Sequence, residues 1–255
     1  MSSSLTAAPH ALRLEGVGRR FGALHAVREV SLAIALGERR AILGPNGAGK
    51  TTLFNVIAGD FLPTRGQVFF FGEDVTRLPA HLRTRRGLTR TYQNSLLFAG
   101  LSVADNLYLA VRGVQPRRLS MRRPGRGDPY RTRAAALAAT VGLAEAMALQ
   151  VSELSHGQQR QLELGMALAG EPRLLLLDEP AAGLSPGERA GLVQLLAGLP
   201  RDLTLMIIEH DMDVALQVAD RVTVMHQGDV VADGTPEEIQ TNPTVHRIYL
   251  GGYGA

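Results

Sequence analysis

Short runs of apolar residues bounded by polar ones open the chain, and they predict strands. Such runs cover residues 11–16, 30–36, 39–43 and 67–71, each of a length typical of a strand. A helical pattern follows at residues 53–58, behind a glycine-rich stretch. The first third therefore predicts a β-rich segment that contains one helix.

The middle of the chain, residues 78–169, has mainly helical patterns. Residues 134–149 are the clearest of them, because they are rich in Ala, Leu and Met. Residues 112–133 differ, since they carry eight arginines and a single acid, Asp128. We interpret this segment as an exposed loop or arm. It is either a solvated loop or a contact for anionic lipid headgroups; nucleic-acid contact is disfavoured because Tyr130 is its one aromatic residue.

The last third alternates between strand and helix patterns. Residues 174–177 are continuously apolar, which is typical of a strand buried on both faces. Further strands are predicted at 203–208, 222–226 and 230–232, the last two forming a hairpin, and helices at 188–199, 212–219 and 236–249. This alternation predicts an α/β fold with a mostly parallel sheet, an antiparallel β portion and an inserted helical subdomain. The predicted boundaries are 10–90 and 170–235 for the core, 91–169 for the helical subdomain and 236–255 for the C-terminal tail.

Composition narrows the class of protein. The 255 residues are 45% hydrophobic and 20% charged, as in a globular protein with a sizeable core. The chain has no cysteine, which excludes disulfides, and no run of about 18 apolar residues that would span a membrane. Residues 1–9 lack the apolar block of a secretory signal. We therefore expect a cytoplasmic protein, and its net charge of +3 is too small to indicate nucleic-acid binding.

The glycine-rich stretch matches the phosphate-loop pattern between a predicted strand and a predicted helix. It consists of Gly44, Pro45, Asn46, Gly47, Ala48, Gly49, Lys50, Thr51 and Thr52. Its backbone N–H groups are suited to phosphates, Lys50 to the β- and γ-phosphates, and the Thr51 hydroxyl to Mg²⁺. Lys50 is also the one lysine among 27 basic residues, which indicates that this position needs a compact ammonium group.

The presence of a single lysine in the chain also disfavours a guanine nucleotide as the ligand. Guanine is usually recognised by an Asn-Lys-x-Asp motif, and Lys50 already belongs to the phosphate loop. Phe21 lies upstream among basic residues and is either an adenine-stacking ring or a core aromatic. The sequence therefore predicts ATP as the nucleotide.

Two acids follow the apolar run at residues 174–177. Ligands bind at the carboxyl ends of parallel strands, where Asp178 and Glu179 are expected to lie. Asp178 is suited to hold Mg²⁺ through water, and Glu179 to polarise an attacking water.

A further motif, Leu154-Ser155-His156-Gly157-Gln158, resembles the Leu-Ser-Gly-Gly-Gln signature of ATP-binding cassette (ABC) ATPases. Four other positions match motifs of that family in the same order along the chain. They are Phe21 for the A-loop aromatic, Gln93 for the Q-loop, residues 182–185 for the D-loop and His210 for the switch histidine. The resemblance covers about residues 10–250 and implies a P-loop NTPase core with a helical signature subdomain.

The resemblance also implies roles. Two cassettes would dimerise head to tail and enclose two ATP molecules, with the signature residues of one subunit facing the γ-phosphate held by the other. That trans site would comprise Ser155, His156, Gly157 and Gln158. Gln93 would bind Mg²⁺, and His210 would orient the water with Glu179. His156 replaces the first glycine of the signature, and Ser185 stands where many members have Asp, which puts the usual D-loop contact in question.

Several stretches are similar to the branched-chain amino acid importer type of this family. They are residues 90–98, 101–107, 179–184, 209–212 and 242–251. That group also handles urea, amides and aromatic acids. The resemblance implies a peripheral ATPase on the cytoplasmic face of the inner membrane. Its partners would be a second ABC ATPase, identical or paralogous, permease subunits and, indirectly, an extracytoplasmic solute-binding protein.

Two alternatives compete with an importer. A soluble cassette ATPase acting on nucleic acid or ribosomes is disfavoured, because such members carry two cassettes or a long coiled-coil insertion. A degenerate, regulatory cassette is disfavoured by the presence of Lys50, Asp178, Glu179 and His210.

Overall fold

The computed structural model describes residues 10–91, 97–115 and 128–250, and their strands form two sheets. The smaller sheet is antiparallel, with the strand order β2 (Leu24–Ala35), β1 (His10–Phe21), β4 (Arg65–Phe70) and β5 (Glu73–Asp74). The larger sheet has the order β10 (Asp229–Gly234), β9 (Arg221–His226), β3 (Arg39–Leu43), β8 (Thr204–Ile208), β7 (Leu174–Asp178) and β6 (Leu88–Arg90). Its neighbouring strands are parallel, apart from the edge hairpin β9–β10. The predicted α/β fold is thus confirmed.

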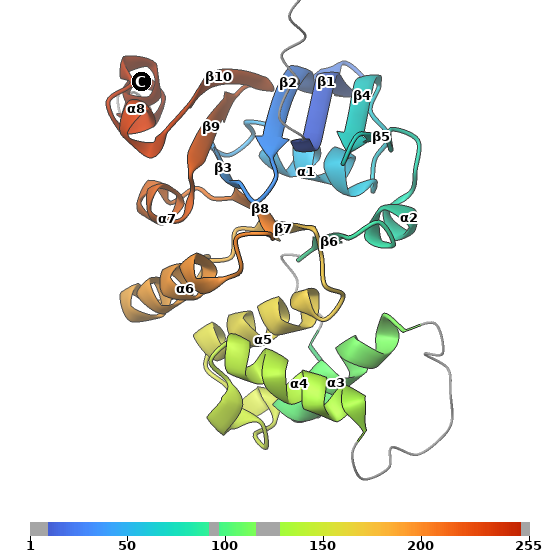
Figure 1. Ribbon diagram of the computed structural model, residues 1–255. Helices are drawn as coiled ribbons and strands as arrows, with labels where there is room; N and C mark the ends of the chain where they lie inside the picture. Colours follow the sequence, from blue (N-terminus) through green and yellow to red (C-terminus); the bar gives the residue numbers. More distant parts are fainter. Residues whose placement is uncertain (1–9, 92–96, 116–127, 251–255) are drawn as a thin grey trace, which may run out of the picture.

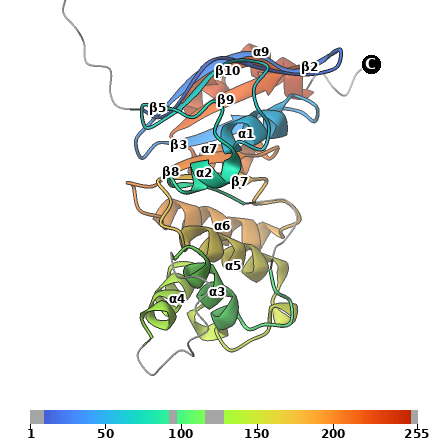
Figure 2. The same ribbon diagram turned by 90° about the vertical axis from the view of Figure 1, so that its right-hand side faces the viewer.

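The helices of the described residues lie between and beside these sheets (Figure 1). They are α1 (Lys50–Ala58), α2 (Ala80–Thr84), α3 (Val103–Gly113), α4 (Pro129–Thr140), α5 (His156–Leu168), α6 (Pro186–Gly198), α7 (Met212–Val218), α8 (Pro236–Gln240) and α9 (Pro243–Leu250). Figures 1 and 2 both show α3, α4 and α5 together at one end of the molecule, with β1, β2 and β4 at the other.

Strand β7 shows why the larger sheet is covered on both faces. All five of its residues are buried, and alternate leucines enter different cores. Leu174 and Leu176 pack with α1 and the smaller sheet, whereas Leu175 and Leu177 pack with the helical side that includes α5, α6 and α7. The alternation follows from the two-residue period of a strand. It fixes the residue after Leu177, Asp178, at the end of a strand enclosed from both sides.

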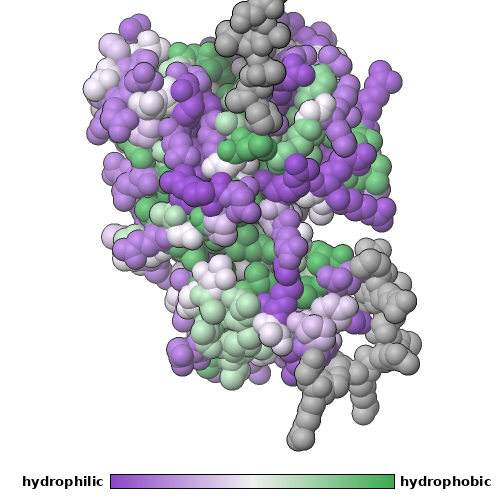
Figure 3. All heavy atoms as spheres, viewed as in Figure 1, coloured by the Kyte–Doolittle hydropathy of each residue, from purple (hydrophilic) through white to green (hydrophobic). Residues whose placement is uncertain are grey.

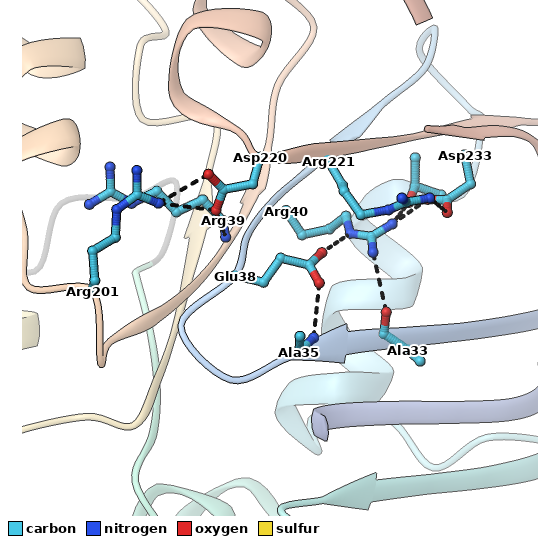
Figure 4. A network of polar contacts seen from close by, with 10 residues as sticks. Ala33, Ala35, Glu38, Arg39, Arg40, Arg201, Asp220, Arg221 and Asp233 are labelled. Carbon is cyan, nitrogen blue, oxygen red and sulfur yellow. Dashed lines mark hydrogen bonds and ion pairs between the residues drawn. The ribbon is translucent and has the colours of Figure 1, made fainter. Parts of the chain in front are cut away.

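Buried arginines fix β3, the strand that leads into the phosphate loop. Arg40 is 2% exposed and pairs with Glu38 and Asp233, while Arg221 pairs with Asp233 from the neighbouring strand (Figure 4). The backbone N–H of Arg39 donates to Asp220 at 2.9 Å. These contacts connect β3 with β9 and β10, so the start of the phosphate loop is held by several strands at once.

Parts of the middle of the chain differ from the prediction. The helix predicted at 134–149 is wrong beyond Thr140, because the chain turns at Gly142, whose φ is +74°, and continues as a short 3-10 helix, Ala144–Ala146. The three-residue strand β6 falls in a stretch predicted to be mainly helical. These three residues form a strand because they pair with β7, which lies more than 80 residues away in the sequence.

The arm predicted at 112–133 is helical at both of its described ends. Arg112 and Gly113 complete α3, and α4 begins at Pro129 behind the N-cap Asp128, so the loop interpretation is wrong there. Residues 116–127 of the arm lie outside the described residues. The helical tail predicted at 236–249 consists of two helices, since α8 ends at Gln240 and α9 begins at Pro243.

Among the described residues, the helices are too short and too polar for any of them to cross a membrane. Hydrophilic residues cover most of the upper part of the face shown in Figure 3, over the two sheets.

Candidate functional site

The phosphate loop links the buried strand β3 to α1 and requires glycine at two positions. Gly44 has a φ of +152°, and a Cβ there would lie 2.3 Å from the carbonyl oxygen of Met225. Gly49 has a φ of +100°, and a Cβ there would lie 2.2 Å from the carbonyl oxygen of Ala26. Both clashes involve backbone atoms of neighbouring strands, so only glycine lets the loop approach them. The first turn of α1 then points its free N–H groups toward the loop.

Lys50 is buried at the start of α1. It is 5% exposed, and its ammonium group donates to the carbonyl oxygens of Gly44 at 2.6 Å and Pro45 at 3.2 Å. Burial lowers the pKa of Lys50, and the carboxylates of Glu179, Asp178 and Glu209 oppose that shift. Acids at the carboxyl ends of β7 and β8 thus act electrostatically on one cation, as expected where parallel strands end at the same edge of a sheet.

A cleft of about 690 Å³ opens over the loop. It is lined by residues 46–52 and Glu179 together with residues 23–26, Arg28 and Gln227. Its volume lies in the range of small-molecule sites. The structure therefore brings together the phosphate loop and the predicted acid, which are more than 120 residues apart in the sequence.

Asp178 ends β7 and is almost fully enclosed. One of its oxygens, Oδ2, accepts a hydrogen bond from the Arg90 guanidinium at 2.8 Å, and the side chains of the pair are 1% and 7% exposed. Arg90 also reaches Asp60 at 3.0 Å and the side chain of Asn55 in α1. The other oxygen, Oδ1, is buried and accepts no hydrogen bond within the described part of the chain. An orphaned carboxylate oxygen at this position fits a cation or its bound water.

Glu179 lies beyond the strand end in an unusual backbone conformation. Its φ is +48°, and its backbone N–H donates to the carbonyl of Ile208 at 3.0 Å. The left-handed conformation is strained for a non-glycine residue and frequently marks a functional site. Oε2 of Glu179 lies 3.9 Å from Nδ1 of His210, whose side chain is 56% exposed. The two predicted catalytic side chains are therefore neighbours, although only Glu179 is among the residues that line the cleft.

Glu209 is a buried acid of this region that the sequence did not indicate. It is fully buried, and its Oε1 accepts a hydrogen bond from the backbone N–H of Ala181 at 3.0 Å. Burial raises the pKa of the Glu209 carboxyl, and the hydrogen bond from Ala181 opposes that shift. Glu209 thus ties the segment after Glu179 to the segment that carries His210.

The predicted signature residues start α5 and do not line the cleft in the described structure. Ser155 is the N-cap, whose hydroxyl accepts from the backbone N–H of Gln158 at 3.2 Å, and the Gln158 side chain accepts from the Ser155 N–H at 3.0 Å. His156 is the first helical residue and Gly157 the second. Figure 1 places α5 in the lower part of the molecule and α1 in the upper part, so a single chain keeps these two sites apart.

Two predicted ligands remain without a described role. The ring of Phe21 is 40% exposed, packs edge-on against Phe61 at 5.5 Å and lies under the Arg19 guanidinium. It is not among the side chains that line the cleft, so adenine stacking by Phe21 stays a prediction. Gln93 lies outside the described residues.

Comparisons with known proteins decide the family. The sequence profile described as ABC transporter matches residues 27–182, more than half of the chain. The chain belongs to the ABC transporter family. A second profile, described as branched-chain amino acid ATP-binding cassette transporter, matches residues 230–255 of this ABC protein.

Curated relatives of this ABC protein are similar over nearly their whole length. The high-affinity branched-chain amino acid transport ATP-binding protein BraF of Pseudomonas aeruginosa is 39% identical over 251 residues, covering 94% of this chain and 97% of BraF. LivG of Escherichia coli, which carries the same description, is 39% identical over 250 residues with the same coverage.

Solved structures agree in fold. The ADP conformation of MJ1267, an ATP-binding cassette of an ABC transporter, has a TM-score of 0.85 at 30% identity and covers 95% of this chain and 99% of that one. The dimeric post-hydrolysis state of the cassette MJ0796, bound to ADP and phosphate, has a TM-score of 0.74 at 25% identity and covers 88% and 98%. This ABC protein is therefore an ATP-binding cassette with the family's nucleotide-binding fold.

The structure of the cassette adds three residues that sequence reasoning missed. Arg90 and Glu209 had no local signal, because their partners are distant in the sequence. Glu188 did have a local signal, since it lies three residues after Ser185, which is the spacing of a capping box. That spacing predicts its contact with Ser185 but not its contacts with α5.

The Arg90–Asp178 pair predicts a large loss of stability when the cation is removed. We expect Arg90→Met to lower the free energy of unfolding by about 3 to 5 kcal/mol, because it leaves a buried carboxylate without its partner. Urea unfolding of the purified chain measures the change. Arg86→Met is the matched control, because Arg86 pairs with Glu73 at the surface, with exposed fractions of 40% and 66%, and its loss is expected to stay below about 1 kcal/mol. Equal losses in the two variants would contradict the assignment.

Proposed function

We propose that this ABC protein is the ATP-hydrolysing subunit of an importer that takes up branched-chain or related amino acids and amides. The observation that carries the proposal is the cleft in which Lys50 and Glu179 face the same space at the ends of buried strands. The match of residues 230–255 to the branched-chain profile, and the descriptions of BraF and LivG, support the class of solute.

ATP would bind with its phosphates on the loop. The backbone N–H groups of the loop and the Lys50 ammonium would hold the β- and γ-phosphates, since these positive groups lie together on the loop that lines the cleft. Thr51 and Asp178 would hold Mg²⁺, together with Gln93; the orphaned Oδ1 of Asp178 supports this assignment. Mg²⁺, when bound, neutralises negative charge on the phosphate oxygens.

Hydrolysis would use Glu179, which lines the cleft, and its neighbour His210. Glu179 would accept a proton from a water molecule whose oxygen bonds to the γ-phosphorus. The bond from that phosphorus to the β,γ-bridging oxygen breaks, and the products are ADP and inorganic phosphate. His210, 3.9 Å from Glu179, would orient the water and contact the γ-phosphate.

The second half of each ATP site would come from another cassette. Ser155, Gly157 and Gln158 stand at the start of α5, away from the cleft of their own chain. Two chains arranged head to tail would place these residues on the γ-phosphate held by the partner's loop. The dimeric structure of MJ0796 supports such an assembly for this fold. The partner would be a second copy or a paralogous cassette.

Closure of the dimer on ATP would drive permease subunits between inward- and outward-facing states, and hydrolysis would reopen it. The chain would therefore work at the cytoplasmic face of the membrane, bound to the permeases. An extracytoplasmic binding protein would deliver the solute, which this chain never contacts.

Co-purification from the native cells tests the proposal. A tagged chain, extracted with a mild detergent, is expected to carry two multi-spanning permease subunits and a second cassette, which mass spectrometry would identify. A chain that brings down ribosomal or DNA-associated proteins instead would support the soluble ATPase and refute the importer.

A further inference from the structure

Glu188, in the first turn of α6, makes two sets of hydrogen bonds with its two carboxylate oxygens. Oε2 accepts from the backbone N–H of Ser185 at 3.0 Å and from its hydroxyl at 2.8 Å. Oε1 accepts from the hydroxyl of Ser155 at 3.1 Å and from the backbone N–H of Gly157 at 2.9 Å. The first set closes the N-terminus of α6, and the second reaches another helix, α5.

Helix capping explains only the first set. A capping box needs one glutamate oxygen on the backbone N–H of the N-cap residue, and Oε2 fulfils that need. The contacts of Oε1 span 33 and 31 residues of sequence. They occupy donors that α5 itself does not use, because the N–H groups in the first turn of a helix have no partner within it.

The fit between Glu188 and the start of α5 is close. A Cβ on Gly157 would lie 2.7 Å from Oε1 and 2.8 Å from Cγ of Glu188, so a glycine is required for the carboxylate to approach. The Ser155 hydroxyl accepts from the Gln158 N–H and therefore directs its own proton to Glu188. The positive end of the helix dipole favours an anion at this point.

The carboxylate remains ionised under physiological conditions. The pKa of Glu188 is lowered to about 2, chiefly by the backbone N–H of Ser185, then by the Ser185 hydroxyl, the Gly157 N–H and the Ser155 hydroxyl. In the isolated chain, the negatively charged carboxylate of Glu188 thus accepts the hydrogen bonds of Ser155 and Gly157.

We propose that Glu188 is a specificity-determining residue of the trans site, because its carboxylate occupies the two donors that a γ-phosphate must take over for the dimer to close. The proposal rests on the function proposed above, in which Ser155 and Gly157 face the partner's ATP. A γ-phosphate carries more charge and more acceptor oxygens than a carboxylate and can displace Glu188. ADP has no γ-phosphate, so Glu188 keeps its donors and the dimer stays open. Glu188 thus disfavours the ADP-bound state, and binding sites commonly gain specificity by disfavouring a competing ligand in this way.

Sedimentation of the full chain tests this role, with the co-purifying second cassette added if there is one. The parent protein carries Glu179→Gln, so that ATP is not consumed. We compare it with the same protein carrying Glu188→Gln or Glu188→Asp in addition. Glutamine keeps the size but loses the charge, whereas aspartate keeps the charge but is one methylene shorter, which withdraws it from α5. Both are expected to form the dimer at about tenfold lower ATP concentration and to give detectable dimer with ADP.

Glu238→Gln in the same parent is the matched control. Glu238 forms an equivalent capping box with Thr235 at the start of α8. The ATP midpoint of this control is expected to equal that of the parent. Thermal unfolding checks that all variants are folded.

The outcomes separate the two proposals. Unchanged or higher ATP midpoints in both Glu188 variants would overturn the role of Glu188 and leave the proposed function standing. The absence of any ATP-dependent dimer in every protein, the parent included, would overturn the trans site and the role of Glu188 with it.

Discussion

Replacing Glu179 with Gln is expected to lower the steady-state rate of ATP hydrolysis by at least about a hundredfold, while ATP binding is retained. Glutamine has nearly the same size, but it cannot accept the proton of the attacking water. The buried Lys50 and the loop that would hold the phosphates are unaffected. Loss of one of the acids that face Lys50 also removes a negative charge from the neighbourhood of the γ-phosphate. The variant is therefore expected to accumulate as an ATP-bound dimer.

Phosphate release and equilibrium binding of ATP measure the two halves of this prediction. Glu171→Gln is the matched control, because Glu171 shares the left-handed conformation, with a φ of +48°, and pairs with Arg133 outside the cleft. Its turnover is expected to equal that of the native chain. Turnover near the native rate in Glu179→Gln would show that another group accepts the proton.

The elements that form the cleft could be predicted largely from local sequence. A five-residue strand, a glycine-rich loop and a helix follow one another without interruption from Arg39 to Ala58, and β7 leads directly into Asp178 and Glu179. Each of these signals lies within a few residues, so tertiary contacts do not alter it. The hairpin predicted around Gln227 and Gly228 is confirmed for the same reason, because its turn is encoded where it forms.

Elements that depend on distant partners could not be predicted in this way. The strand β6 has three residues and exists because β7 offers a free edge to it. The helix predicted at 134–149 is too long for a local reason. The composition of this segment favours helix, but the chain turns at Gly142. Gly142 is a local signal for a turn, but the many alanines around it favoured the prediction of one continuous helix.

The charged partners of the site residues were equally hidden. Asp178 meets Arg90 across 88 residues, and Glu188 meets Ser155 across 33. The residue types that could act on phosphate or Mg²⁺ were evident from motifs, but the groups that hold them in place come from neighbouring strands and helices. Family resemblance supplied the predicted roles of Ser155 and Gly157, and the structure supplied the carboxylate of Glu188 that accepts their hydrogen bonds.

Replacing Lys50 with Arg is expected to be nearly as damaging as the loss of Glu179, although the charge is kept. Lys50 is 5% exposed, and its ammonium group fits between the carbonyl oxygens of Gly44 and Pro45. A guanidinium is planar and broader, and it presents its donors as a fixed fork. The guanidinium group at this position would displace the phosphate loop or project past it. We expect ATP affinity to fall by at least about tenfold and turnover by at least about a hundredfold.

Thermal unfolding with and without ATP gives the most direct measurement of this change. ATP that binds the folded chain raises the unfolding temperature by mass action, so Lys50→Arg is expected to lose most of that increase. Arg201→Lys, the reverse exchange at a surface pair with Asp220, is expected to keep it in full. A Lys50→Arg variant that binds ATP and turns it over within about threefold of the native chain would mean that the site needs only a positive charge. The single lysine of the chain would then be an accident of composition, whereas the expected loss would tie it to the geometry of the loop.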